Sequence, residues 1–171
     1  YELLVKLNMQ NPDVRNHLLK AVEEWNDAWD IDGIRLDAAD CIDLQFFREL
    51  KETTTKKKPD FWLMGEINKG EYTRWLQPDL LDSVTNYALF NGICNSLNSK
   101  NLCDIGFNVN REFNREWGLY KDKLLYNFVD NHDVNRVASL IKDEKDYFVC
   151  CSCNWHWRSK CASNSRRQQV F

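Results

Sequence analysis

The chain has 171 residues, 43% hydrophobic and 29% charged, which is an ordinary globular composition with enough length for one core. The formal net charge is −3, and it divides into −7 for residues 1–149 and +4 for residues 150–171, which contain no acid. The acidic body argues against a nucleic-acid surface, and no apolar run approaches the ~20 residues of a membrane helix.

The first elements are predicted by a helix start signal and by hydrophobic spacing. Asn11 followed by Pro12 predicts a helix start, because Asn caps helices and Pro suits the first helical position. Apolar residues at helical spacing extend this helix to about Asp30. An apolar run over about residues 31–37 then predicts a strand that ends in Asp37.

A second helix and a second strand follow. We expect Asp43 to cap the helix, whose buried face carries Phe46, Phe47 and Leu50. Its basic end at residues 56–58 suits the negative pole of the helix dipole, and Pro59 stops it. The continuous apolar run over residues 61–64 predicts a strand covered on both faces, and Glu66 lies just after it.

The second half of the chain continues the alternation of helices and strands. The expected elements are a short helical segment at 72–81, a strand at 83–87, a long loop or short helices at 88–103, a helical stripe of Val109, Phe113 and Trp117, a strand at 124–129, and a helix from Val137. This order predicts an α/β fold with roughly half of a (β/α)₈ barrel. A complete barrel needs roughly 250 residues, so we expect a fragment whose start is missing.

Three acids lie at the predicted carboxyl ends of strands. Asp37 and Glu66 are 29 residues apart, close to the length of one strand, one helix and their loops. Asp133 follows 67 residues after Glu66, which suits the end of the strand two units later. Active sites of (β/α)₈ barrels are built at this end of the strands. The three acids are therefore candidate catalytic residues.

The predicted spacing of Asp37 and Glu66 fits one reaction. Neighbouring strands lie ~4.8 Å apart, and retaining glycosidases hold a nucleophile and an acid/base ~5–5.5 Å apart. Arg35 precedes Asp37 by two residues, so both side chains face the same side of the strand, where a guanidinium favours an ionised carboxylate. Taken singly, each acid is more often a helix cap or an Arg partner, so the joint pattern carries the hypothesis.

Three segments resemble motifs of the α-amylase family, glycoside hydrolase family 13. They are residues 32–39 (Asp-Gly-Ile-Arg-Leu-Asp-Ala-Ala), residues 65–67 (Gly-Glu-Ile) and residues 128–133 (Phe-Val-Asp-Asn-His-Asp). The resemblance implies that Asp37 is the nucleophile, Glu66 the general acid/base and Asp133 the carboxylate that stabilises the transition state. It also implies substrate-binding roles for Arg35, Asn131 and His132.

The resemblance implies a retaining glycoside hydrolase with four barrel strands, about the fourth to the seventh. Its expected partner is a starch-like α-glucan or malto-oligosaccharide, with neither nucleic acid nor a membrane. Alternatives are an α-glucan transglycosylase, an α-1,6-glucosidase, or an inactive amylase-fold remnant or interaction protein. Many starch α-amylases have Lys-His where this chain has Asp40 and Cys41, which makes a maltodextrin-acting member as good a match as a starch-liquefying one.

The resemblance fixes no cofactor. Many family members hold structural calcium near a small domain inserted after the third strand, and most of that domain is missing here. Calcium is therefore left open for the full-length protein, and no metal ligand is predicted in this chain. The family motif at the end of the third strand is also absent, so we expect the isolated chain to have little or no glycosidase activity.

The cysteines and the carboxyl end set the predicted domain boundary. We expect residues 1–149 to form the partial catalytic domain and residues 150–171 to be an atypical Cys-rich basic tail, non-native or disordered. A zinc site there is disfavoured, because Cys150 and Cys153 have no matching second pair. Cys41, Cys94 and Cys103 are expected to be buried thiols. Free thiols mildly favour a reducing compartment such as the cytoplasm, while the location itself stays unknown.

Overall fold

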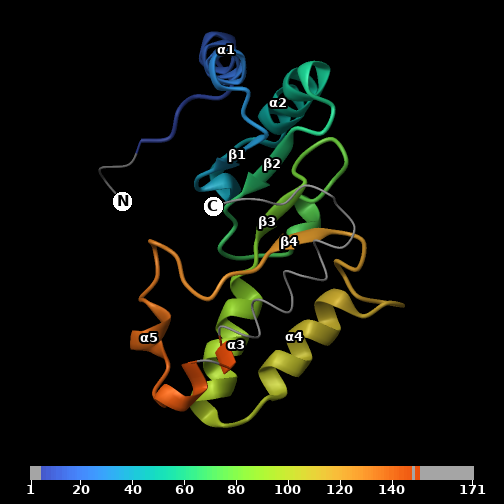
Figure 1. Cartoon of the computed structure of the whole chain (residues 1–171). Coiled ribbons are helices and arrows are strands. Elements are labelled where there is room, and N and C mark those ends of the chain that lie inside the picture. Colours follow the sequence, from blue (N-terminus) through green and yellow to red (C-terminus); the bar gives the residue numbers. More distant parts are fainter. Residues whose placement is uncertain (1–4, 148, 151–171) are drawn as a thin grey trace. The chain divides into compact units, whose positions relative to one another are not determined.

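The computed structural model describes residues 5–147 and 149–150, so the predicted tail from residue 151 onward lies outside the described residues. The chain divides into two compact units, Tyr1–Val84 and Thr85–Phe171. Strands and helices alternate in the first unit, whereas helices predominate in the described part of the second (Figure 1). None of the helices in the described ranges combines the length and the apolar content needed to cross a bilayer.

The first unit is built on short parallel strands. Its elements are α1 (Pro12–Trp29), β1 (Gly33–Leu36), a 3₁₀ turn (Ala39–Cys41), α2 (Leu44–Lys57), β2 (Trp62–Gly65), a second 3₁₀ turn (Tyr72–Arg74) and β3 (Ser83–Thr85), which ends one residue past the unit. β2 pairs in parallel with β1 on one side and with β3 on the other. α1 and α2 pack against each other (Figure 1). This is the repeated strand–helix architecture that the sequence predicts.

The predicted ends of α1 are confirmed. The side chain of Asn11 accepts a hydrogen bond of 2.9 Å from the backbone N–H of Asp13, which satisfies one of the free donors of the first turn. Asp30 ends the helix in the left-handed conformation, with φ 47°, and its N–H donates to the carbonyl of Asn26. A non-glycine residue at positive φ is uncommon, and Asp tolerates it better than most.

The start of α2 differs from the prediction in one respect. Asp43 occupies the N-cap position, but its side chain makes no capping hydrogen bond. The carboxylate instead accepts from the side-chain amide of Gln10 at 3.3 Å and lies 3.6 Å from the ammonium group of Lys6. Contacts from the segment before α1 therefore replace the local cap. The predicted apolar face of α2 is confirmed, since Phe46, Phe47 and Leu50 are buried.

Lys58 ties the end of α2 to the turn that precedes β1. Its ammonium group donates to the carbonyls of Asp30 and Ile31 at 3.2 and 3.1 Å, and it lies 2.7 Å from the carboxylate of Asp32. Hydrogen bonds to Asp32 and Asp30 raise the pKa of Lys58 above its ordinary value. The predicted helix-end lysine thus contacts two carbonyl and two carboxylate groups of the neighbouring connection, since it also donates to the carboxylate of Asp30 at 3.0 Å.

Gly65, the last residue of β2, allows a close approach at the carboxyl end of the strand. A Cβ atom at this position would lie 2.9 Å from the Cβ of Ala39 and 2.5 Å from a methyl group of Leu81. The absence of a side chain lets the 3₁₀ turn that follows β1 pack directly on the end of β2. Glu66, one of the candidate acids, is the next residue along the chain.

The second unit contains α3 (Tyr87–Ser99), α4 (Cys103–Phe113), β4 (Leu124–Tyr126) and α5 (Val137–Leu140). α3 packs against α4 (Figure 1). One apolar cluster of buried residues consists of Leu89, Ile93, Leu97, Val137, Ile141 and Cys150. β4 begins where the sequence predicts a strand but ends three residues earlier, at Tyr126.

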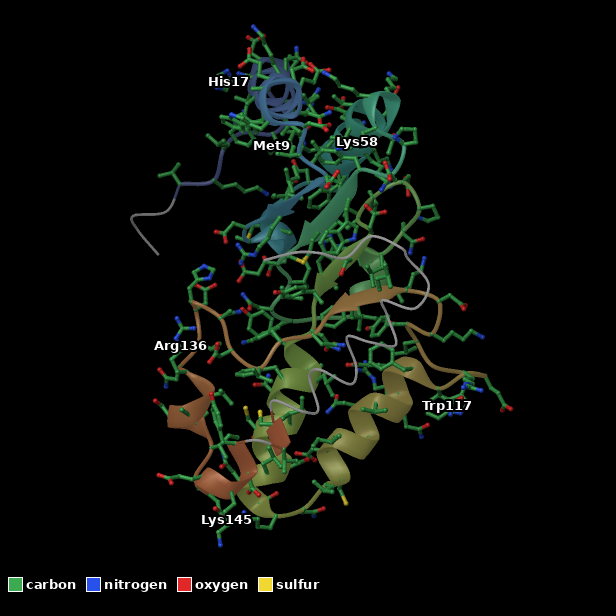
Figure 2. All side chains as sticks on the ribbon, viewed as in Figure 1. Met9, His17, Lys58, Trp117, Arg136 and Lys145 are labelled. Atoms are coloured by element: carbon green, nitrogen blue, oxygen red, sulfur yellow. The ribbon has the colours of Figure 1, made fainter. Side chains whose placement is uncertain are left out.

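Three expected elements of the chain need correction. Residues 87–99 form one helix of 13 residues, because the apolar positions and Ser96 are buried on one face while the other Asn and Ser residues lie outside it. Within the segment 72–81 only Tyr72–Arg74 is helical, as one 3₁₀ turn, and Pro78 lacks the N–H that a continuing helix would use. Trp117 lies beyond the end of α4 and is exposed (Figure 2), so it does not extend the predicted stripe.

The prediction of buried thiols is wrong for two of three cysteines. Cys41 and Cys103 are exposed, and Cys94 is half-buried. Cys41 belongs to the 3₁₀ turn after β1. Cys103 is the first residue of α4 and lies in an exposed stretch of the chain. Burial raises the pKa of the Cys94 thiol above its ordinary value. Cys150 is completely buried.

Candidate active site

Asp37 and Glu66 occupy equivalent positions after neighbouring parallel strands. Leu36 of β1 is the register partner of Gly65 of β2, and the two acids are the residues that follow. Strand ends in parallel register lie ~4.8 Å apart. The sequence-based prediction that Asp37 and Glu66 close adjacent strands is therefore confirmed. Their exposure differs sharply, because the side chain of Asp37 is 76% exposed and that of Glu66 only 7%.

One guanidinium group joins the two acids. Nη1 of Arg35 donates to Oδ1 of Asp37 at 3.0 Å, and Nη2 donates to Oε2 of Glu66 at 2.9 Å. These charge-assisted hydrogen bonds use the fork of the guanidinium to hold both carboxylates at once. Arg35 lies on the same side of β1 as Asp37, as the two-residue spacing predicts. The result is a fixed Asp37–Arg35–Glu66 triad at the carboxyl end of two strands.

The backbone after Asp37 also binds Glu66. Ala38 adopts a left-handed conformation with φ 42°, which costs a non-glycine residue conformational energy. In this conformation its N–H donates to Oε2 of Glu66 at 3.3 Å, and the N–H of Ala39 donates to the backbone carbonyl of Glu66 at 3.0 Å. The strained turn thus connects the nucleophile candidate to the acid/base candidate.

The other three predicted site residues form one turn in the second unit. The side-chain oxygen of Asn131 accepts hydrogen bonds from the N–H groups of Asp133 at 2.8 Å and Val134 at 3.1 Å. Nε2 of His132 lies 3.3 Å from Oδ2 of Asp133, and both side chains are exposed. The structure therefore brings Asn131, His132 and Asp133 together in one unit, and Arg35, Asp37 and Glu66 together in the other.

Asp130, the first acid of the same motif, has a different environment from Asp133. Its Oδ2 accepts from the N–H of Val137 at 2.9 Å, and its Oδ1 accepts from Arg136 at 3.2 Å. Arg136 lies at the N-terminal end of α5 (Figure 2). Asp130 thus uses both oxygens to hold the segment that leads into α5, and this leaves Asp133 as the acid of this motif with an exposed carboxylate.

The arrangement offers no metal centre in the part of the chain that the structure describes. Within residues 5–147 and 149–150, no three His, Cys, Asp or Glu side chains gather in a group that would hold a metal ion. The polar contacts of Asp37 and Glu66 named above are with a guanidinium and a backbone amide. Carboxylate side chains in general can transfer protons and act as nucleophiles.

Sequence reasoning did not find three polar residues that the second unit places near its candidate site. Tyr87 accepts a hydrogen bond from Asn131, and Asn86 and Glu112 are completely buried and bonded to each other. Asn86 follows directly on β3, so the strand-end rule that selected the three acids would also have selected it. Glu112 carries no such signal, because it lies within α4 on a helix face shared with ordinary apolar residues.

Parallel strands followed by helices, with a carboxylate pair at adjacent strand ends, are the architecture of part of a (β/α)₈ barrel. The chain belongs to the α-amylase family, because residues 1–156 match the family model described as the alpha amylase catalytic domain.

Known proteins of this family resemble the chain over most of its length. A cyclomaltodextrinase from a Bacillus species is 31% identical over 146 residues, which cover 84% of the chain and 26% of that protein. A maltogenic alpha-amylase from Bacillus acidopullulyticus is 32% identical over 137 residues, 78% of the chain and 23% of that protein. A solved cyclomaltodextrinase structure has a TM-score of 0.72 at 28% identity and covers 86% of the chain and 25% of its own. The chain thus spans about a quarter of the length of these relatives.

Proposed function

We propose that this chain carries the central part of the active site of a retaining glycoside hydrolase that cleaves α-glucosidic bonds in starch-like glucans or maltodextrins. The observation that carries the proposal is the Asp37–Arg35–Glu66 triad, in which one guanidinium holds two carboxylates after adjacent strands. The family relationship supports the same reaction class. Retaining glycosidases need two carboxyl groups ~5–5.5 Å apart, which the strand spacing supports.

The exposure of the two acids supports a division of roles. Asp37 is largely exposed and contacts Arg35, and a neighbouring positive charge favours the ionised carboxylate that a nucleophile requires. Glu66 is nearly buried, as suits a group that donates a proton to the leaving oxygen and later removes one from water. Asp133 is the proposed third carboxylate, which binds sugar hydroxyl groups and favours a distorted, oxocarbenium-like ring.

The remaining predicted residues have supporting roles in this proposal. Arg35 holds Asp37 and Glu66 in place, and His132 offers a ring N–H to a substrate hydroxyl group. Asn131 was predicted to bind substrate; its side-chain oxygen accepts from two backbone N–H groups, and its NH₂ group donates to Tyr87. We propose that Asn131 also supports the turn that carries Asp133.

The substrate class is proposed to be maltodextrins or cyclic maltodextrins in preference to long starch chains. The relatives reported above are named cyclomaltodextrinase and maltogenic alpha-amylase. In addition, Asp40 and Cys41 take the place of the Lys-His pair of many starch α-amylases, and both are exposed in the turn after β1. The time course of products from maltoheptaose tests hydrolysis against transfer, since a transglycosylase makes longer oligosaccharides before shorter ones accumulate.

The test of the catalytic roles uses the full-length protein and three variants. We expect Asp37→Ala to lower turnover of maltoheptaose by roughly a thousandfold or more. Glu66→Gln should have an equally large effect on maltoheptaose, whereas an α-glucosyl fluoride should give a rapid burst of fluoride release followed by slow turnover, because fluoride leaves without help from an acid but hydrolysis of the glycosyl-enzyme still lacks its base. Asp79→Asn, an acid in an exposed ion pair, is the matched control. Unchanged turnover in Asp37→Ala would refute the assigned nucleophile.

The isolated 171-residue chain is proposed to have little or no glycosidase activity of its own. The resemblance places a further site motif at the end of a third barrel strand, and that motif is absent from this sequence. Purified chain is assayed on a chromogenic maltoside beside its Glu66→Gln variant. Robust hydrolysis that disappears in the variant would contradict this proposal and show that the triad suffices.

A further inference from the structure

A buried polar cluster fixes the start of α3. Asn86 is completely buried, and its side-chain NH₂ donates to Oε2 of Glu112 at 2.7 Å and to Oδ1 of Asn127 at 3.0 Å. Its side-chain oxygen accepts from the N–H of Leu89 at 3.0 Å and so caps the helix. All the polar atoms of this side-chain amide are engaged, so the first turn of α3 is held in one orientation.

Tyr87, the first residue of α3, has its ring packed and its hydroxyl bonded. The ring lies edge-on to Phe128 with centroids 4.8 Å apart, and it also contacts Phe90. The phenol oxygen accepts a hydrogen bond of 2.9 Å from the side-chain amide of Asn131. Tyr87 directly follows Asn86, the N-cap residue of α3. The buried cluster around Asn86 therefore sets the position of the Tyr87 hydroxyl group.

The side chain of Asn131 connects the Tyr87 hydroxyl group to the turn that carries Asp133, the candidate stabilising carboxylate. While its NH₂ group binds Tyr87, its oxygen accepts from the N–H groups of Asp133 and Val134. An Asn side chain that binds the backbone two residues later replaces a backbone turn and fixes its geometry. The side chain of Asp133 itself is 46% exposed and contacts His132, so its position depends on the backbone of this turn.

We infer that Tyr87 is a positioning residue for Asp133, acting through the side-chain amide of Asn131, with Asn86 and Glu112 as the buried anchor. The importance of Asp133 for catalysis rests on the proposed function. The hydrogen bonds that link Glu112 to Asn86, and Tyr87 through Asn131 to the backbone of Asp133, are independent of that proposal. The alternative is that the Tyr87 hydroxyl is merely a buried polar group with a convenient partner. The two differ in whether removing the hydroxyl loosens the turn at Asp133.

The first experiment measures amide hydrogen exchange at Asp133 and Val134 by NMR in the 171-residue chain. Tyr87→Phe retains the ring that packs on Phe128 and removes only the hydroxyl. We expect exchange at both amides to accelerate by about fivefold, the factor that corresponds to the typical net contribution of one hydrogen bond. Asn131→Ala should accelerate it at least as much, and the double variant should add nothing to Asn131→Ala, since both act through one contact.

Asn98→Ala is the matched control in the same unit. Asn98 of α3 also bridges two backbone groups, accepting from the N–H of Lys142 and donating to the carbonyl of Leu140. Its loss should accelerate exchange at Lys142 and leave Asp133 and Val134 unchanged. Unchanged exchange at Asp133 and Val134 in Tyr87→Phe, or additive effects in the double variant, would overturn the inference.

The second experiment separates this inference from the proposed function. In the full-length protein, Tyr87→Phe should lower kcat about fivefold while KM changes little, because a misplaced stabilising carboxylate weakens binding of the transition state more than that of the substrate. Absence of any α-glucosidase activity in the unmodified protein, together with accelerated exchange in Tyr87→Phe, would refute the proposed function and leave the positioning of Asp133 intact. Accelerated exchange with unchanged kcat would overturn the catalytic part of the inference.

Discussion

The Nη2 atom of Arg35 lies 2.9 Å from Oε2 of Glu66, and this contact joins a partly exposed cation to a nearly buried carboxylate. A buried carboxylate needs hydrogen-bond donors, and Arg35 supplies one to Glu66 in addition to the backbone N–H of Ala38. The other terminal guanidinium nitrogen, Nη1, lies 3.0 Å from Oδ1 of Asp37. One arginine therefore binds both carboxylates that follow β1 and β2.

Replacing Arg35 should destabilise the first unit more than replacing a surface arginine. For Arg35→Gln we expect the free energy of unfolding to fall by about 2–3 kcal/mol, because Glu66 loses its charged hydrogen-bond donor while it stays buried. Arg48→Gln is the control, since Arg48 pairs with Asp79 on the surface and should contribute about 0.5 kcal/mol. Urea denaturation of the three proteins measures both values. Equal effects of the two substitutions would show that the Arg35 contacts do not stabilise the fold.

Ala38 should tolerate glycine but not valine. Its φ of 42° is strained for any residue with a Cβ and most of all for a β-branched one. Ala38→Gly should leave the free energy of unfolding unchanged or raise it by up to about 1 kcal/mol, and Ala38→Val should lower it by about 1–3 kcal/mol. Thermal denaturation at one protein concentration tests the order. Greater stability in the valine variant than in the glycine variant would contradict a left-handed conformation at this position.

Glu112 should make the stability of the second unit depend on pH. Burial raises the pKa of Glu112 from its ordinary value of 4.5 to about 7, against the opposing effects of Asn86 and Arg111. Between these two values the folded chain keeps a proton that the unfolded chain releases, so this contribution to stability is complete below pH ~4.5 and is lost as the pH rises through ~7. The loss is on the order of 3 kcal/mol for a shift of this size.

The variant Glu112→Gln isolates this effect, because glutamine retains an oxygen acceptor for Asn86 and carries no charge. The difference in the free energy of unfolding between the variant and the unmodified chain should shift in favour of the variant from pH 4.5 to pH 8. Denaturant titrations at the two pH values measure that difference. A difference that is the same at both values would mean that Glu112 does not titrate in this range in the folded chain.

The parts of the fold that were predicted correctly depend on local signals. Asn11 and Pro12 alone predict the start of α1. The adjacent positions of Asp37 and Glu66 follow from two short apolar runs that are separated by the length of one strand–helix repeat. Arg35 could be placed beside Asp37 because the period of a strand is two residues. These features depend on a few neighbouring residues, so the sequence alone was sufficient.

The parts that were missed depend on contacts between distant segments. Asp43 lacks its expected capping bond because Lys6 and Gln10 bind its carboxylate. The helix over residues 87–99 was obscured by its many Asn and Ser residues, and it became clear only from the apolar face that α4 and α5 cover. Glu112 is buried by the same packing, and no local pattern marks a buried carboxylate on a helix.

The most direct test of the central claim is to trap a glycosyl-enzyme in the full-length protein. A fluorinated α-glucosyl fluoride forms the covalent intermediate of a retaining glycosidase and slows its breakdown, so the modified residue can be located by mass spectrometry of peptides. We predict a single added sugar on Asp37, and no label after Asp37→Ala. A label on another residue, or release of a product with inverted configuration and no label, would contradict the proposal that Asp37 is the nucleophile of a retaining α-glucosidase.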